Sequence, residues 1–293
     1  MGDQRGIALA LIGLAWIALH QGDFLLSKQR YQDSLALLRE LGDPKDIAHA
    51  LDGLGYVCWI RGEYQESKQH NEEMLTLSKE IGDQRGIAGS LGSLGIVTYG
   101  LRDFQKSREF ILESIALYKE LGHSWGVADR LGDLGELALA MGEYTQAAQF
   151  AQESNAVYAR VVGEFHNWGL RVIGNAALGL GDLQTARKYL CLSLQHALKI
   201  HRWGHALLVL VVIAGLLAKE GKEERAFELL ALVMSHRASW QMGKDKALPL
   251  IAELEAKLPP EVVAAAQARG LARDLDATIQ ELLTELEGEE MDH

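Results

Sequence analysis

Hydrophobic and polar positions alternate with the period of an α-helix along most of the chain. Residues 51–58 carry a face of Leu51, Leu54, Gly55 and Cys58, and residues 67–81 carry a face of Ser67, Asn71, Met74, Leu77 and Ile81. Positions three or four apart lie on one side of a helix, so each stretch predicts an amphipathic helix. A short polar turn separates the two stretches. The pattern therefore predicts a helical hairpin.

The turn of this hairpin recurs along the chain with a nearly constant spacing. Its copies are Gly22-Asp23-Phe24, Gly62-Glu63-Tyr64, Arg102-Asp103-Phe104, Gly142-Glu143-Tyr144, Gly181-Asp182-Leu183 and Gly221-Lys222-Glu223, at spacings of 40, 40, 40, 39 and 40 residues. A fixed period of this length is typical of a solenoid, in which each unit buries its apolar face against its neighbours. The expected repeats are residues 1–41, 42–81, 82–121, 122–162, 163–200 and 201–240, followed by an acidic helical cap at 241–293.

Glycine and other small residues recur at fixed places within the repeat. The first helix carries the pattern L-x-x-L-G at Leu51–Gly55, Leu91–Gly95 and Leu131–Gly135. Glycine inside a helix costs about 1 kcal/mol relative to alanine, so its recurrence predicts a close approach of the second helix. The matching small residues on the second helix are Ser27, Ser67, Ser107, Ala147, Ala186 and Ala226. Gly42, Gly82 and Gly122 are expected to end helices in the left-handed conformation.

Together these features resemble the tetratricopeptide repeat over about residues 3–240. The resemblance implies an all-α fold, a right-handed α-solenoid of helical hairpins with a C-terminal helical cap. The usual unit of that family has about 34 residues and a closing proline, and this chain departs from both. Arrays of the HEAT type have similar periods but lack the G-[DE]-[FY] turn. The long variant is similar to repeats of bacterial signal-transduction ATPases with numerous domains, where an array follows a nucleotide-binding domain and senses an inducer.

The beginning of the chain repeats an internal junction. Residues 2–8 are identical to residues 82–88, so the sequence starts within a turn between two repeats. Natural arrays usually carry a polar cap at this point. We therefore expect a piece of a longer chain, with an ATPase domain of that chain as a partner. The alternative is a complete protein whose first repeat tolerates exposure.

The repeat is lost after Trp240. Three further helical segments are expected at about 244–257, 260–269 and 271–288, punctuated by Pro249, Pro259-Pro260 and Gly270. The preceding helix, residues 206–218, is apolar on all sides and has to be covered on more than one of them. Either the C-terminal tail covers it, or the chain self-associates through repeat 6.

Composition and charge narrow the class of partner. The chain has a net charge of -11, but residues 253–293 hold 11 of the 40 acidic and 3 of the 29 basic residues, so the repeats are nearly neutral. No basic surface is offered to nucleic acid or to an anionic membrane, and neither is expected as a partner. Cys58 and Cys191 lie in apolar stretches of different repeats and are expected to be buried and reduced. With no signal sequence or spanning segment, we expect a cytoplasmic protein.

The resemblance to tetratricopeptide repeats also implies a binding surface, because the first helices of such arrays line the concave face. The expected aromatic trough has gaps at Gly89, Gly92 and Gly100 and consists of Leu9, Ile12, Trp16, His20, His49, Asp52, Tyr56, Trp59, Ile96 and Tyr99. In repeats 4 and 5 these positions become polar, with Asp129, Glu136, Trp168, Arg171 and Asn175. Rigid rings beside small residues suit a peptide, a protein or a small-molecule inducer. The alternative is that the aromatic side chains pack between hairpins.

Signals for chemistry are weak. His196, His201 and His205 are close in sequence, but a turn around Gly204 is expected to separate the last two, and no zinc-site spacing supplies a further ligand. The glycines at 89, 92 and 95 lack the strand and the Gly-Lys-Ser/Thr motif of phosphate loops, and are expected to serve helix packing. We expect no enzyme, no cofactor and no metal. The expected function is that of a sensor or interaction module; the alternatives are a free-standing scaffold or adaptor and, third, an enzyme-associated array.

Overall fold

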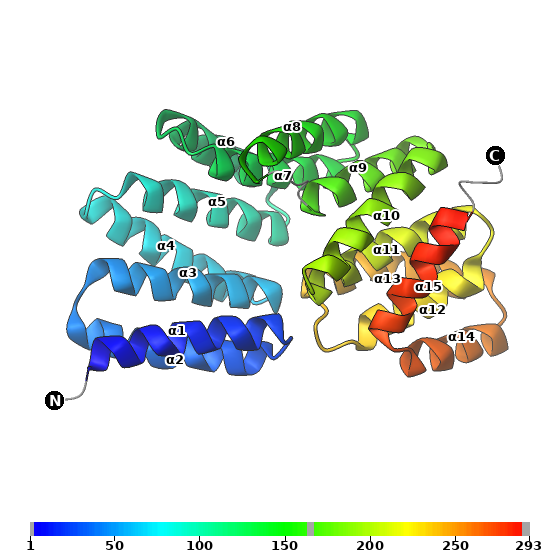
Figure 1. Ribbon diagram of the computed structural model, residues 1–293, viewed down its shortest axis with the longest axis horizontal. Coiled ribbons are helices and arrows are strands. Elements are labelled where there is room, and N and C mark those ends of the chain that lie inside the picture. Colours follow the sequence, from blue (N-terminus) through cyan, green and yellow to red (C-terminus); the bar gives the residue numbers. More distant parts are fainter. Residues whose placement is uncertain (1–2, 163–166, 289–293) are drawn as a thin grey trace. The chain divides into compact units, whose positions relative to one another are not determined.

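The computed structural model describes residues 3–162 and 167–288, and these residues are all-α, as predicted. Ten helices of the described residues pair as α1 (Gln4–His20) with α2 (Phe24–Leu41), α3 (Pro44–Ile60) with α4 (Tyr64–Glu80), α5 (Gln84–Gly100) with α6 (Phe104–Glu120) and, after α7 (Ser124–Ala140) and α8 (Tyr144–Val162) in the chain, α9 (Asn167–Leu180) with α10 (Leu183–Lys199), and α11 (Trp203–Lys219) with α12 (Glu223–Ser235) (Figure 1). Then follow α13 (Gln241–Lys257), α14 (Pro260–Ala272) and α15 (Leu275–Gly288). Among the described residues, no helix is both long and apolar enough to cross a membrane.

The chain forms two compact units, Met1–Leu137 and Ala138–His293, and α7 passes from one into the other. In the first unit α1, α3 and α5 lie side by side, and each packs against the second helix of its own hairpin (Figure 1). The expected repeat boundary at 162/163 and the last residues of the expected cap, 289–293, lie outside the described residues.

Two residue types mark the ends of helices, aspartate at the start and glycine at the end. Aspartate side chains accept a hydrogen bond from a backbone N–H of the first turn, for example Asp3 from Gly6 at 2.8 Å and Asp83 from Gly86 at 3.0 Å. This satisfies a donor that has no partner within the helix. The predicted left-handed conformation is confirmed at Gly42, Gly82 and Gly122, with φ of 77°, 71° and 64°.

Arg102 occupies a place in the hairpin turn that glycine holds in the other repeats, and its φ is 66°. A side chain is strained in this region. We expect Arg102→Gly to raise the free energy of unfolding by about 0.5 kcal/mol, because relief of strain exceeds loss of the guanidinium contact 5.2 Å from the Phe104 ring. Leu101→Gly is the control, since Leu101 has a φ of -77° and should lose stability. Urea denaturation measures the free energy of unfolding of both variants. An equal loss of stability in the two would contradict the strain at Arg102.

The predicted close approach of the two helices in a hairpin is confirmed. A Cβ added at Gly95 would lie 2.5 Å from Ile111 Cγ1, and one added at Gly174 would lie 2.8 Å from Leu190 Cγ. The facing serine uses this proximity: the Ser107 hydroxyl donates to the Gly95 carbonyl at 2.8 Å. All six small residues predicted on the second helices are fully buried. Both the glycine and the small residue are therefore needed for hairpin packing.

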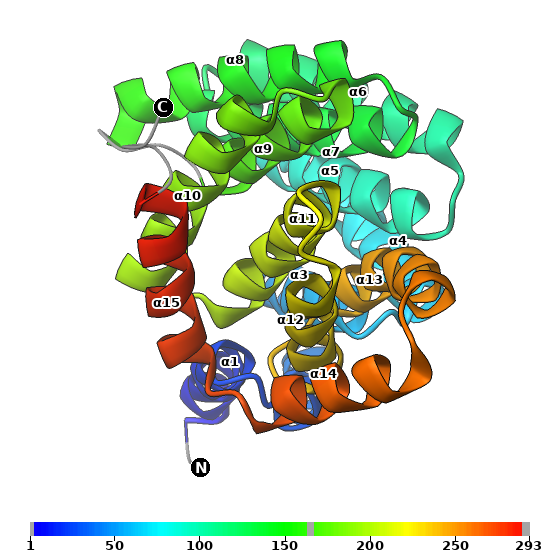
Figure 2. The same cartoon turned by 90° about the vertical axis from the view of Figure 1, so that its right-hand side faces the viewer.

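In the second unit the C-terminal helices cover the apolar helix α11. Residues 206–214 of α11 are all buried, and α13 packs on both α11 and α12. Figure 2 shows α15 running beside α10 and α14 beside α12, consistent with the helix contacts. Leu254, Ala266, Ile279 and Leu282 join the same hydrophobic core as α10–α12. The tail thus covers α11, and the reason for expecting self-association through repeat 6 is removed.

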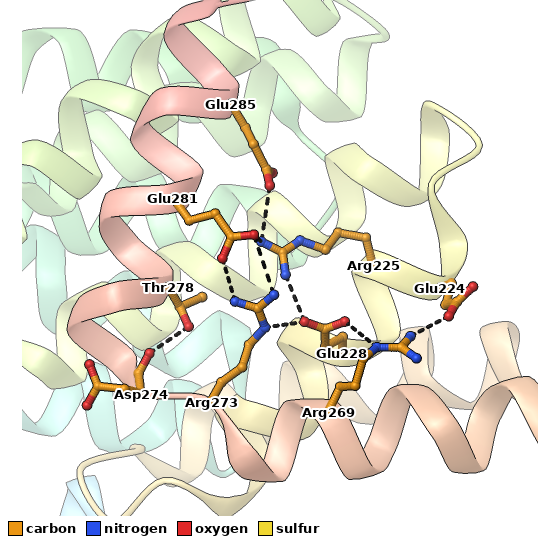
Figure 3. Close-up of polar contacts among 9 residues, drawn as sticks. All are labelled: Glu224, Arg225, Glu228, Arg269, Arg273, Asp274, Thr278, Glu281 and Glu285. Atoms are coloured by element: carbon orange, nitrogen blue, oxygen red, sulfur yellow. Dashed lines mark hydrogen bonds and ion pairs between the residues drawn. The ribbon is translucent and has the colours of Figure 1, made fainter.

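A buried carboxylate joins α12 to the last two helices (Figure 3). The Glu228 side chain is only 6% exposed. It accepts hydrogen bonds from Arg225 at 2.8 Å, from Arg269 at 3.0 Å and from Arg273. Burial by itself would raise the pKa of Glu228, but the bonds from Arg269 and Arg273 hold that pKa below its ordinary value. A charged Glu228 therefore stabilises the cap.

Gly270 does not separate two helices as the sequence predicted; it lies inside α14. A Cβ at this position would be 2.3 Å from the Glu228 carbonyl oxygen and 2.6 Å from Ala231 Cβ. The prediction was wrong because glycine here serves close helix packing, as in the hairpins. Pro249 likewise lies within α13, at a position where the helix continues.

Candidate functional site

In the first unit, α3 has one face with solvent-exposed side chains, called its free face here. It packs against α2 and α4 and also contacts α1 and α5. His49 and Asp52 are exposed and Tyr56 is half-buried, at spacings of three and four residues. Such spacing places the three side chains on one side of the helix. The free face of α3 therefore combines two polar side chains with an aromatic ring.

The same stripe continues on α1, one repeat earlier. Leu9 and Trp16, which lie 40 residues before His49 and Tyr56, are 36% and 45% exposed. The Trp16 ring contacts His20 edge-on, with 4.5 Å between ring centroids. We call Leu9, Trp16, His49, Asp52 and Tyr56 the inner face. It contains an exposed tryptophan whose ring is held by a neighbour within its own helix.

Two members of the expected trough are core residues. Trp59 is 5% exposed and Ile12 is 7% exposed. The residue that corresponds to Trp59 in α1 is Leu19, which is also buried. Trp59 instead supports the inner face, since its ring stacks on that of Tyr56 with centroids 5.8 Å apart. The contribution of Trp59 is to position Tyr56.

Tyr99 and Glu136 join α5 to α7. Tyr99 is half-buried and Glu136 is 3% exposed. The Tyr99 hydroxyl donates to Glu136 Oε1 at 3.4 Å, and the Tyr99 ring lies 5.9 Å from that of Phe104. These predicted site residues therefore contact each other, and the carboxylate of Glu136 lies mostly beneath the surface.

A partly buried arginine that pairs with two aspartates was missed in the sequence. Arg130 lies over Gly92, so that a Cβ there would meet Arg130 Nη1 at 2.1 Å. Its Nε is 3.1 Å from Asp133 Oδ2, and it also pairs with Asp129. Burial raises the pKa of Asp133 to about 7, although Arg130 acts against that rise. Gly92, taken as a gap in the trough, was the signal: the gap admits a long side chain from the next repeat.

Polar side chains share the inner face with aromatic ones. His49 and Asp52 of α3 are exposed and lie in one stripe with Trp16 and Tyr56. Such a surface offers hydrogen bonds as well as apolar contact.

The remaining predicted site residues lie in the second unit, on α9. Arg171 is 1% exposed, and its guanidinium lies 4.6 Å from the centroid of the Trp168 ring. Trp168 also packs against His205 and Trp240, at centroid distances of 6.1 and 6.4 Å. Asn175 is half-buried. Trp168 and Arg171 therefore belong to a packed cluster that joins α9, α11 and the residue before α13.

The turn between the last two expected repeats lies before Gly204. His201 has a φ of 50°, and α11 already begins at Trp203. Gly204 lies inside the helix, where a Cβ would be 2.2 Å from Trp240 Nε1. His205 packs edge-on against Trp240 at 4.8 Å. The expected position of this turn was wrong because the glycine was again needed for packing.

Two sequence models described as tetratricopeptide repeats match the chain, one over residues 6–80 and the other over residues 127–167. The hairpins in these two ranges match the tetratricopeptide repeat. This confirms the family that the turn and the small residues indicated. No curated protein matches the chain in sequence. The tetratricopeptide array is a module of the protein-interaction type, and its stacked hairpins present extended binding surfaces.

Solved structures share the fold. A Rap protein complexed with Competence and Sporulation Factor matches with a TM-score of 0.69 and 13% identity, over 94% of this chain and 75% of that one. The Rap conjugation gene regulator of plasmid pLS20, in complex with the Phr* peptide, matches with a TM-score of 0.65 and 12% identity. This match covers 94% of this chain and 75% of that one. A Signal Transduction ATPase with Numerous Domains with a tetratricopeptide repeat sensor, from Pyrococcus horikoshii, matches with a TM-score of 0.57 and 13% identity. The match covers 95% of this chain and 44% of that one. This chain spans less than half of that ATPase.

Proposed function

We propose that this tetratricopeptide array is a non-catalytic sensor module that binds a short peptide on its inner face. The observation that carries the proposal is the exposed Trp16 in one stripe with Tyr56, His49 and Asp52. A peptide presents apolar side chains together with backbone donors and acceptors along its whole length. Aromatic rings supply contact area at low entropy cost, and the polar side chains can satisfy the peptide backbone. The complex of a Rap protein of this fold with the Phr* peptide supports the choice of ligand class.

Truncation of Trp16 tests the inner face. The probe is a set of peptides selected from a random display library against the full chain. Loss of a central aromatic contact typically costs about 2 kcal/mol, which is about 30-fold in Kd. We therefore expect Trp16→Ala to weaken these peptides about 30-fold in calorimetric titration. Because Trp16 is 45% exposed, its truncation should leave the fold intact, which circular dichroism checks.

Leu112→Ala is the matched control, since Leu112 is 50% exposed and lies on α6, a second helix of a hairpin. Peptide affinity of this variant should equal that of the wild type. Equal affinity of the Trp16 and Leu112 variants would reject the inner face. Failure to select any peptide would reject the ligand class.

We further propose that the module works within a larger regulatory protein. Ile7, Leu14 and Ile17 of α1 are each more than half exposed. The equivalent side chains of α3 are Ile47, Leu54 and Val57, and all three are buried in the array. A further element packed on α1 would bury its three side chains in the same way. Such an element would have one state packed on α1 and one state released from it. Bound peptide can shift the equilibrium between these two states only by the difference in its affinity for them.

The reading frame upstream of residue 1 tests this second part. A nucleotide-binding domain fused ahead of α1 would support the larger regulator and would provide the element that covers Ile7, Leu14 and Ile17. An isolated gene with no fused domain would contradict it and would favour the alternative of a free-standing scaffold. Peptide binding on the inner face does not depend on this outcome.

A further inference from the structure

Three metal-ligating side chains meet in the second hairpin. Cys58 of α3 and Glu66 and His70 of α4 place one sulfur, one carboxylate oxygen and one imidazole nitrogen within 4.8 Å of one another. Cys58 is fully buried, and the other two side chains are partly buried. Glu66 and His70 are four residues apart on one helix, so both project from the same side. The cluster therefore follows from the helix register.

This combination occurs in a single repeat of the array. The residues at the equivalent positions of the other repeats are Ala18, Leu26 and Arg30; Thr98, Lys106 and Phe110; Ala138, Gln146 and Phe150; Ala177, Thr185 and Tyr189; and Leu217, Arg225 and Leu229. None of these is a cysteine, a histidine or a carboxylate. Packing of the hairpin is thus compatible with side chains that cannot bind a metal, so packing alone does not explain the three ligands in repeat 2.

The imidazole of His70 lacks a hydrogen bond on its inward side. Its Nε2 is buried and has no hydrogen-bond partner, since Glu66 Oε1 lies 3.7 Å away, beyond hydrogen-bond distance. The other carboxylate oxygen, Glu66 Oε2, accepts from Lys28 Nζ at 2.7 Å, and Lys28 also bonds to Glu63 at 2.8 Å. Lys28 therefore orients the Glu66 carboxylate and leaves Oε1 directed toward the imidazole.

We propose that Cys58, Glu66 and His70 bind a zinc ion. Thiolate, imidazole and carboxylate are the ligands that Zn²⁺ takes in proteins, with bonds of about 2.0–2.3 Å. Tetrahedral geometry puts such ligand atoms about 3.3–3.8 Å apart, so the set has to contract by about 1 Å. The thiol proton of Cys58 leaves to solvent as the Zn–S bond forms, and a water completes the coordination. The ion would tie α3 to α4 and, through Lys28, to α2.

Zinc titration of the full chain tests the site. We expect one high-affinity Zn²⁺ per chain in competition with a chromophoric chelator. Co²⁺ in its place should give a thiolate-to-metal charge-transfer band. Cys58→Ala and His70→Phe should each weaken zinc at least tenfold, and Cys58→Ala should abolish the band. Both variants should fold, because alanine and phenylalanine occupy these positions in other repeats.

Cys191→Ala is the matched control, since Cys191 is the other buried cysteine and forms no disulfide. It should keep the wild-type affinity and the charge-transfer band. The proposal is overturned if the wild type binds no zinc, or if zinc binding survives both the Cys58 and the His70 substitution unchanged.

Discussion

Gly270→Ala is expected to loosen the contact between α14 and α12 and to lower the free energy of unfolding by about 3 kcal/mol. The added Cβ would lie 2.3 Å from the carbonyl oxygen of Glu228, and a backbone atom cannot turn away as a side chain can. Either α14 moves outward or α12 bends. Urea denaturation measures the loss, and hydrogen exchange should show faster exchange in α14 and α15 than in α1–α4.

Gly13→Ala is the control for this substitution. Gly13 also lies inside a helix, but no atom is within 4 Å of an added Cβ. Alanine should stabilise α1 there by about 0.5–1 kcal/mol through helix propensity alone. If Gly270→Ala also raised the free energy of unfolding, as expected for Gly13→Ala, the close approach of α14 to α12 would be contradicted.

Glu228→Gln is expected to lower the free energy of unfolding by about 2 kcal/mol at neutral pH, because three arginines lose a buried ionic acceptor. Burial opposes the charge of Glu228, but Arg269 and Arg273 hold its folded pKa below the ordinary value of about 4.3. A lowered folded pKa contributes stability that is present above that value and is lost as pH falls through the folded pKa. The gap between wild type and variant should therefore shrink below about pH 4.

Glu224→Gln provides the matched comparison, since Glu224 also pairs with Arg269 but its side chain is 53% exposed. An exposed ion pair contributes less than about 1 kcal/mol. Denaturation at several pH values compares the two variants. Equal effects at neutral pH, or a Glu228→Gln effect that grows in acid, would contradict the role assigned to the buried carboxylate.

Local features of the repeat could be predicted from the sequence because each has a direct physical cause. The glycine of L-x-x-L-G has no side chain where the second helix approaches, and Gly42 adopts the φ that other residues avoid. Aspartate at the start of a helix accepts from the first backbone N–H groups. These interactions act within one hairpin, so a single repeat carries the information.

Which aromatic side chains are exposed could not be read from the periodicity. Tyr56 and Trp59 are three residues apart on α3, yet Trp59 is buried and Tyr56 lies on the inner face. Which side of a helix is buried depends on the angle at which the neighbouring helices pack against it. Arg130 was missed for the same reason, because its place over Gly92 depends on contacts between repeats. The Cys58, Glu66 and His70 cluster joins residues of two helices, and the structure brings their ligand atoms within 4.8 Å of one another.

Peptide binding on the inner face is tested by a crystal structure of the full chain with a selected peptide. We expect the peptide to lie across α1 and α3, with an apolar side chain against Trp16 and Tyr56 and polar contacts to His49 or Asp52. A peptide bound to the second helices α2, α4 and α6, or held within the second unit, would contradict it.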